Sequence, residues 1–100
     1  MNAQQKKALA DRAGIFKALG HPARLAMVTA LGKREHCVCE LQEIVGLDMS
    51  TVSNHLSVLR NAGLVEADKR GKQVFYSLRL RCTAGFIECV DRAIAEGRGC

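Results

Sequence analysis

Five cysteines are the residues of this 100-residue chain whose type and spacing best suit chemistry. Cys37 and Cys39 lie two residues apart, and the others are Cys82, Cys89 and Cys100. Their odd number argues against a framework of disulfides. In the thiolate form, cysteine binds soft metal ions and reacts with oxidants. The cysteines therefore predict a soft-metal site or a set of redox-active thiols.

The pair Cys37 and Cys39 stands at the predicted start of a helix. The positive end of the helix dipole favours thiolates there, as do three nearby residues, Lys33, Arg34 and His36. Residues two apart on a regular helix point about 200° away from each other, because the helix repeats every 3.6 residues. One ion can therefore bind both sulfurs only if the first turn is unwound or distorted, which suggests that ion binding would remodel this helix.

The chain is organised around residues 37–62, which predict two short helices joined by a tight turn. The first helix has an apolar face formed by Leu41, Ile44 and Val45, and the second has one formed by Val52, Leu56 and Leu59. Between them, Gly46 suits the left-handed residue that ends a helix, and Asp48 or Ser50 can cap the next helix. This arrangement predicts a helix-turn-helix.

The second helix has a polar, uncharged face opposite its apolar stripe, formed by Ser50, Ser53, Asn54, Ser57 and Asn61. Short polar side chains of this kind hydrogen-bond to base edges and phosphates. The face predicts binding to double-stranded DNA through Ser50, Thr51, Ser53, Asn54 and Ser57, although the solvated face of an ordinary helical hairpin would look similar. Arg60 could reach a phosphate or form a structural ion pair, and the sequence leaves both open.

A β-hairpin is predicted directly after these helices. Residues 64–67 begin one strand, and residues 73–78, which alternate and are rich in β-forming types, make the second. The turn between them carries the cations Lys69, Arg70 and Lys72 around a glycine. A hairpin in this position is a wing, and its basic tip would lie near the phosphates of a flanking groove.

Two terminal helices are predicted at residues 3–19 and 83–97, and a further helix at about 22–32. Apolar rows run along the terminal helices, formed by Leu9, Ala13 and Phe16 in the first and by Phe86, Val90, Ala93 and Ile94 in the second. One domain of this size has little core left for both rows. We therefore expect a homodimer that buries these rows. It would present the second helix of each helix-turn-helix, which we call the reading helix, to successive major grooves.

The composition predicts one folded domain over residues 1–100, mostly α-helical with a β-hairpin. Hydrophobic residues make up 48% of the chain and charged residues 25%, as in globular proteins. A formal charge of +5 favours a polyanionic partner, while three Phe, one Tyr and no Trp are too few to stack single-stranded bases. Because there is no apolar run of membrane-spanning length and no signal-peptide core, we expect a cytoplasmic protein without membrane association.

Four segments of the chain together resemble the ArsR/SmtB family of bacterial metal-responsive repressors over nearly the whole length. They are FKALGHPARLAMVTAL at 16–31, CVCEL at 37–41, STVSNHLSVLRNAGLV at 50–65 and GKQVFYSL at 71–78. The resemblance implies a winged helix-turn-helix homodimer that represses an operator and is released when an inducer binds a dedicated site.

In the arsenic-responsive branch of that family, the corresponding segment reads Cys-Val-Cys-Asp-Leu-Cys. The residues that match it are Cys37, Val38, Cys39 and Leu41, whereas Glu40 replaces Asp and Gln42 stands in place of the third cysteine. The resemblance thus implies As(III) or Sb(III) as the inducer at Cys37 and Cys39. The third sulfur would come from Cys82, Cys89 or Cys100, or be missing.

Other ions of the family find fewer ligands in this chain. Cd(II), Pb(II) and Zn(II) sites of the same branch recruit ligands near the N-terminus, and residues 1–20 contain no Cys or His. The family's zinc site on the terminal helix needs histidines, and none follows His55. We expect His21 to begin a helix and His55 to lie at the edge of the core rather than to bind metal.

Other interpretations of the cysteines remain. The same kind of repressor could respond to oxidant or sulfide through a disulfide or polysulfide, for which the resemblance implies Cys39 and Cys89. Cys89 could equally be a small buried hydrophobe, and Cys82 and Cys100 could be incidental. An enzyme is disfavoured, because His36 beside Cys37 is the only general base near a thiol and little chain remains to build a cleft.

Overall fold

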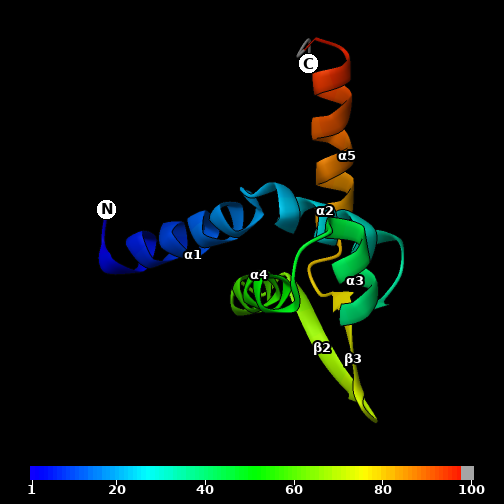
Figure 1. The fold of residues 1–100 in the computed structure, drawn as a ribbon. Helices are drawn as coiled ribbons and strands as arrows, with labels where there is room; N and C mark the ends of the chain where they lie inside the picture. The colour runs from blue at the N-terminus through cyan, green and yellow to red at the C-terminus, as the bar shows by residue number, and fades with distance from the viewer. Residues whose placement is uncertain (98–100) are drawn as a thin grey trace.

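The computed structural model describes residues 1–97 and confirms a mostly α-helical fold with a β-hairpin. Its elements are α1 (Ala3–Leu19), α2 (Pro22–Lys33), β1 (His36–Cys37), α3 (Val38–Val45), α4 (Met49–Asn61), β2 (Val65–Arg70), β3 (Gln73–Leu78) and α5 (Cys82–Ala95). In Figure 1, α2, α3 and α4 gather at the centre, from which α1, α5 and the β2–β3 hairpin project in different directions. None of the helices found within residues 1–97 is long and apolar enough to cross a membrane.

Local sequence signals set the ends of the central helices. His21 caps α2, whose first turn contains Pro22. Helix α3 ends at Gly46, whose φ of 68° lies in the left-handed region that glycine adopts without strain. Of the two candidate caps for α4, Asp48 takes the position, and its carboxylate accepts a hydrogen bond from the Thr51 N–H at 3.2 Å.

The core lies where α2, α3, α4 and the base of the hairpin meet. Its fully buried large side chains are Met27, Val28, Leu41, Val52, Leu56, Leu59, Leu64 and Val65. Burial of each contributes roughly 1.5–3 kcal/mol relative to exposure. The predicted apolar stripe of α4 is confirmed, because Val52, Leu56 and Leu59 are all in this group. Packing of that stripe fixes which face of α4 points outward.

The sheet contains a strand that the sequence does not predict. β1 pairs antiparallel with β3, with His36 opposite Tyr76 and Cys37 opposite Phe75, and β3 lies between β1 and β2. Two residues are too few to show an alternating pattern, so only the tertiary pairing reveals the strand. The segment before the helix-turn-helix is therefore part of the same sheet as the hairpin.

The hairpin is longer than predicted. β2 continues to Arg70, which puts Lys69 and Arg70 in the strand and leaves Gly71 and Lys72 as the turn. Gly71 has a φ of 62°, a conformation that a two-residue hairpin turn requires. Lys69 and Arg70 thus belong to the paired strands, and of the three cations Lys72 alone lies in the turn.

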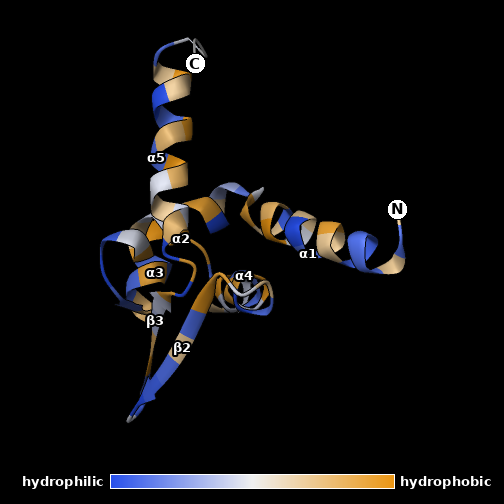
Figure 2. Cartoon of the chain, turned by 180° about the vertical axis from the view of Figure 1, so that it is seen from behind, coloured by the Kyte–Doolittle hydropathy of each residue, from blue (hydrophilic) through white to orange (hydrophobic). Residues whose placement is uncertain are grey.

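The apolar rows of the terminal helices lie on the surface of the single chain. Leu9 and Phe16 of α1 are 45% and 59% exposed, and Phe86, Val90 and Ile94 of α5 are 50%, 41% and 62% exposed. Figure 2 shows hydrophobic bands along both helices. Phe16 and Phe86 meet edge to face with ring centroids 5.9 Å apart, so the two rows join where α1 and α5 approach α2.

Candidate nucleic-acid interface and thiol segment

The outward face of α4 carries four of the five predicted reading residues as free side chains. Ser50, Ser53, Asn54 and Ser57 are exposed, and their side chains make no hydrogen bond within residues 1–97. Thr51 differs, because its hydroxyl and its N–H both donate hydrogen bonds to the carboxylate of the cap residue Asp48. These two hydrogen bonds lower the pKa of that carboxyl group. Four unoccupied donor and acceptor groups on one helix face are available to a partner.

The hairpin carries three cations, of which one is already occupied. Lys69 and Lys72 are exposed and form no ion pair among the described residues. Arg70 donates two hydrogen bonds to the carboxylate of Glu35, at 2.7 and 2.9 Å, and one to Asp68 at 2.9 Å. The hydrogen bond from Arg70 lowers the pKa of Glu35 and the two carboxylates raise the pKa of Arg70. Two free lysines therefore remain for phosphates in this state.

The reading helix is held against α2 by a cluster of basic side chains. Arg24 lies beside the ring of His55 of α4, with its Nη1 3.2 Å from Nδ1, and donates to the carbonyl of Ala18 at 2.6 Å. The His55 ring also packs on His21, with centroids 4.4 Å apart. Burial, then His21 and Arg24, lower the pKa of His55. His21 thus begins α2, and His55 lies half-buried at the α2–α4 contact, in the positions expected from the sequence.

Cys37 and Cys39 occupy two different environments at the start of α3. Cys37 is buried, belongs to β1 and is the residue that caps α3, with extended φ and ψ of −77° and 164°. Cys39 lies in the first turn of α3 and is exposed. The expected geometric conflict assumed that both residues are helical. Because Cys37 lies outside the helix, that assumption is wrong, and drawing the two sulfurs together involves the β1–α3 junction instead.

Glu40 anchors this junction. Its carboxylate accepts hydrogen bonds from Arg34 at 2.9 Å and from the N–H of Cys37 at 3.1 Å, which with Cys37 makes a capping box. The hydrogen bond from Arg34, followed by that from Cys37, lowers the pKa of Glu40 to about 2. His36 is buried, and its Nδ1 lies 3.7 Å from Glu40 without a hydrogen-bond partner within residues 1–97. Residues 35–39, which we call the thiol segment, are therefore held in place by Glu40, an anionic residue of α3.

The described residues of one chain do not complete a three-ligand metal site. Cys82 and Cys89 both lie on α5 and are exposed. Among residues 1–97, no three His, Cys, Asp or Glu side chains lie close enough to hold one ion. Cys100, the remaining candidate ligand, lies outside the described residues. The pair Cys37 and Cys39 therefore stays a prediction as a site for a thiophilic ion.

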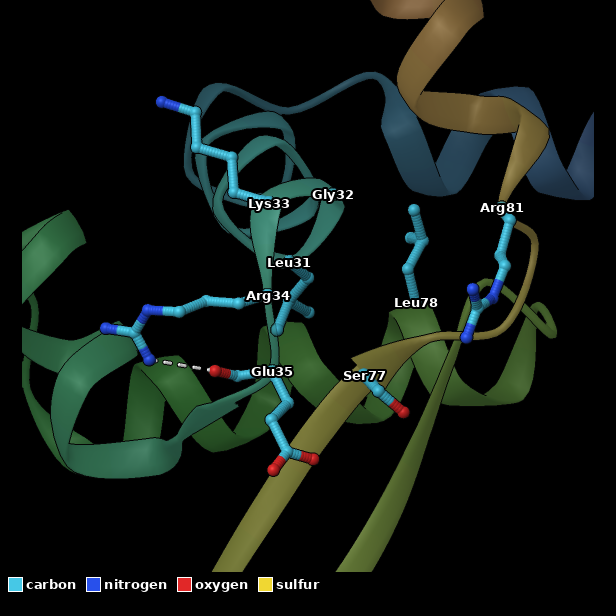
Figure 3. A pocket seen from close by; sticks show the side chains of 8 residues that line it. All are labelled: Leu31, Gly32, Lys33, Arg34, Glu35, Ser77, Leu78 and Arg81. Atoms are coloured by element: carbon cyan, nitrogen blue, oxygen red, sulfur yellow. Dashed lines mark hydrogen bonds between the residues drawn. The ribbon is translucent and has the colours of Figure 1, made fainter.

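A polar cavity of about 420 Å³ lies between the end of α2 and the residues that follow it, the end of β3, and the residue before α5. Figure 3 shows its lining, in which Arg34 turns toward α3 and donates to the backbone carbonyl of Glu35 at 3.0 Å. The Glu35 side chain extends the other way, over β3, and Arg81 faces Ser77 across the cavity. Of these two adjacent residues, Arg34 thus binds α3 through Glu40, and Glu35 binds the hairpin through Arg70.

A helix-turn-helix with an exposed polar second helix, followed by a basic hairpin, defines a winged helix-turn-helix regulator. The model of the bacterial regulatory proteins of the arsR family matches residues 21–67. The chain is 43% identical over 86 residues to the HTH-type transcriptional regulator Rv0081 of Mycobacterium tuberculosis, covering 85% of this chain and 75% of that protein. The chain therefore belongs to the arsR family, which is one of regulators rather than enzymes.

Further comparisons agree with this assignment. The crystal structure of Rv0081 superimposes with a TM-score of 0.79 at 33% identity, over 96% of this chain and 93% of that chain. The Biofilm growth-associated repressor of Xylella fastidiosa is 42% identical over 66 residues, which are 66% of this chain and 58% of that protein. The cadmium resistance regulatory protein CadC homolog of Staphylococcus aureus is 39% identical over 69 residues, 68% of this chain and 57% of that protein. The chain thus spans less than two thirds of the length of these last two relatives.

Sequence reasoning missed Glu35 and Arg24 as parts of the site. Glu35 stood in a charged connector, where one carboxylate among several cations gives no pattern. Arg24 lies on a helix whose polar residues show no unusual spacing. The opposite charges of Glu35 and Arg70 were a signal, but charge alone cannot identify a pair 35 residues apart in the chain.

Proposed function

We propose that the protein is a DNA-binding transcriptional repressor that acts as a homodimer. A thiophilic metal(loid) that binds Cys37 and Cys39 releases the repressor from its operator. The observation that carries the DNA-binding part is the free polar face of α4 beside a hairpin with two unpaired lysines among the described residues. Short polar side chains suit base edges and phosphates, and lysines add a sequence-independent attraction to phosphates.

The homodimer is supported by the exposed apolar rows of α1 and α5. These rows line a groove of about 480 Å³ with residues of α2, including Phe16, Leu25, Phe86 and Val90. Contiguous exposed apolar surface on a small domain is typical of an interface with another protein. A twofold copy would cover both rows and set the two reading helices about one turn of DNA apart.

Thiophilic inducers are supported by the donor set of the thiol segment. Two sulfurs favour soft ions over hard ones, and the relative from Staphylococcus aureus is named for cadmium resistance. As(III) or Sb(III) suits the pair best if a third sulfur comes from Cys82, Cys89 or Cys100 of either subunit. Cd(II), Pb(II) and Zn(II) remain candidates for the same thiolates.

DNA binding is tested by fluorescence anisotropy with a palindromic fragment from upstream of the gene, in reductant. Ser53→Ala/Asn54→Ala should weaken binding by at least about tenfold, since a bidentate base contact is worth roughly 1–3 kcal/mol. Gln4→Ala, an exposed polar residue of α1, is the matched control and should bind as the wild type does. Equal affinity of the double variant and the control would reject α4 as the reading helix.

The inducer is tested by titrating As(III), Cd(II) and Zn(II) against the preformed complex. Release of the wild type and of Cys82→Ser/Cys89→Ser/Cys100→Ser, but not of Cys37→Ser/Cys39→Ser, would establish the pair as sufficient. Release of the wild type alone would add one of these three other cysteines to the site.

A second function has one observation in its favour, which is that Cys39 and Cys89 are both exposed and free. A repressor of the same fold could then respond to oxidant or polysulfide through these thiols. Release by polysulfide or peroxide, with no release by any metal(loid) under reducing conditions, would favour this alternative.

A further inference from the structure

One ion pair in the described structure connects the thiol segment to the hairpin. Both oxygen atoms of the Glu35 carboxylate accept from the Arg70 guanidinium, at 2.7 and 2.9 Å. Paired, parallel hydrogen bonds of this kind fix the relative position of the two groups more firmly than a single contact does. Both side chains are about half exposed, at 44% and 47%. The pair is therefore ordered but remains within reach of a competing ligand.

The strand register puts Arg70, the hairpin residue of this pair, on the same face of the sheet as Cys37. Cys37 lies opposite Phe75, and Phe75 lies opposite Asp68, so the three residues form one row across β1, β3 and β2. Residues directly opposite each other in antiparallel strands point to the same face. The Arg70 guanidinium lies 4.7 Å from the centroid of the Phe75 ring and is bonded to Asp68.

These contacts close a ring of neighbours. Along the backbone, Glu35 is two residues from Cys37. Across the sheet, Cys37 faces Phe75, whose ring supports Arg70, and Arg70 returns to Glu35. A displacement of Cys37 toward Cys39 must therefore strain the β1–β3 pairing, the Glu35–Arg70 pair, or both.

Arg70 also belongs to the surface proposed to contact DNA. A guanidinium binds a carboxylate and a phosphate with the same two-pronged geometry. While Glu35 holds it, Arg70 is kept over Phe75, whereas Lys69 and Lys72 are exposed and form no ion pair among the described residues.

We infer that Glu35 is a positioning residue through which the thiol segment acts on the wing. Its carboxylate holds Arg70 and the β2–β3 hairpin in the orientation set by β1, so that a ligand drawing Cys37 and Cys39 together also moves the wing. This inference rests on the proposed function, and it adds a route from the β1–α3 junction to the wing.

The test uses phenylarsine oxide, which condenses with two thiols, forming two As–S bonds and releasing one water. To confine it to the pair, all proteins carry Cys82→Ser, Cys89→Ser and Cys100→Ser. Backbone amide shifts are recorded by ¹H–¹⁵N NMR without DNA, before and after one equivalent of the probe. The compared proteins are this background, Glu35→Gln, the charge exchange Glu35→Arg/Arg70→Glu, and Asp11→Asn. The last breaks the exposed Lys7–Asp11 pair of α1 and is the matched control.

In the background protein and in Asp11→Asn, the probe should shift the amides of residues 38–41 and of residues 69–73. In Glu35→Gln the shifts at 38–41 should persist, while those at 69–73 fall to less than about half. The charge exchange should restore them, which a merely structural effect of losing the carboxylate would not produce.

Unmoved wing amides in the background protein, or equal wing shifts in Glu35→Gln, would overturn the inference while leaving the thiol site intact. If the probe leaves both thiols of the pair free in a thiol titration, the thiol site and the inference fail together. The DNA-binding part of the proposed function is judged separately by the anisotropy measurement with wild-type protein.

Discussion

The centre of the molecule and its two terminal helices differ in how far the chain covers its own apolar surface. In α2, α3 and α4, the large apolar side chains that face inward are almost completely buried. In α1 and α5, side chains as large as Phe16, Phe86 and Ile94 remain half exposed or more. The inward-facing apolar side chains of α2, α3 and α4 are thus covered within one chain, whereas the terminal helices have apolar surfaces that another molecule can cover. Two experiments test this contrast, and two more test the polar contacts of the hairpin and of the β1–α3 junction.

The greatest loss of stability is expected in the centre. Leu56→Ala removes a fully buried side chain of α4 and should lower the free energy of unfolding by about 2–5 kcal/mol, because the cavity cannot be filled. Val58→Ala, on the same helix but 40% exposed, is the control and should cost much less. Urea unfolding measures both. Similar losses for the two variants would mean that α4 is not packed as described.

The next effect concerns the terminal helices. Ile94→Glu should raise the dimer dissociation constant by at least about 30-fold, the equivalent of a 2 kcal/mol hot spot, because a buried charge would lack a partner. Arg92→Gln makes the same change in charge on the same helix and should leave the constant nearly unchanged. Sedimentation equilibrium distinguishes them. A dimer equally stable in both variants would remove α5 from the interface.

A smaller effect is expected at the hairpin. Lys69→Ala/Lys72→Ala should reduce the slope of log K against log salt by about 0.9 for each phosphate that the wing no longer neutralises, to a similar degree on any DNA sequence. Lys7→Ala removes a lysine that is already paired with Asp11 and serves as the control. An unchanged slope for the double variant would show that the hairpin does not bind phosphates.

The weakest effect is the acid response of the thiol segment. The pKa of Glu40 is lowered from 4.5 to about 2 in the folded protein, mainly by Arg34. The unfolded state therefore binds the proton more readily, so the stabilisation is present above pH 4.5 and is lost as the pH falls toward 2. Glu40→Gln should show a shallower loss of the urea midpoint over this pH range than the wild type, with the exposed Glu43→Gln as control. Parallel curves would exclude the Glu40 contacts as a source of acid sensitivity.

The apolar spacing and local turn chemistry of the sequence were sufficient to predict the helix-turn-helix and the hairpin. Val52, Leu56 and Leu59 repeat with the helical period, and Gly46 and Asp48 are the residue types that end one helix and begin the next. The bounds predicted for the last helix, 83–97, differ slightly from those of α5, which spans Cys82–Ala95. Helix ends depend on one or two hydrogen bonds, which the apolar period does not determine.

The candidate site was predicted only in part. The polar face of α4 and the basic hairpin follow from residue type, but the environment of the cysteine pair does not. Cys37 was expected on a helix and instead lies in β1, buried opposite Phe75. A strand of two residues exists only because its partner strand is brought to it by the rest of the fold.

The helices, their apolar faces, the wing and the family could all be read from the sequence alone, because these depend on interactions between residues close in the chain. Which charged residues pair with each other could not be read from the sequence, because tertiary packing decides it. Arg70 is bound to Glu35 rather than left free beside Lys69 and Lys72, and Cys37 is enclosed while Cys39 is exposed. Such differences depend on the distances and burial that arise only when segments distant in the chain are packed together.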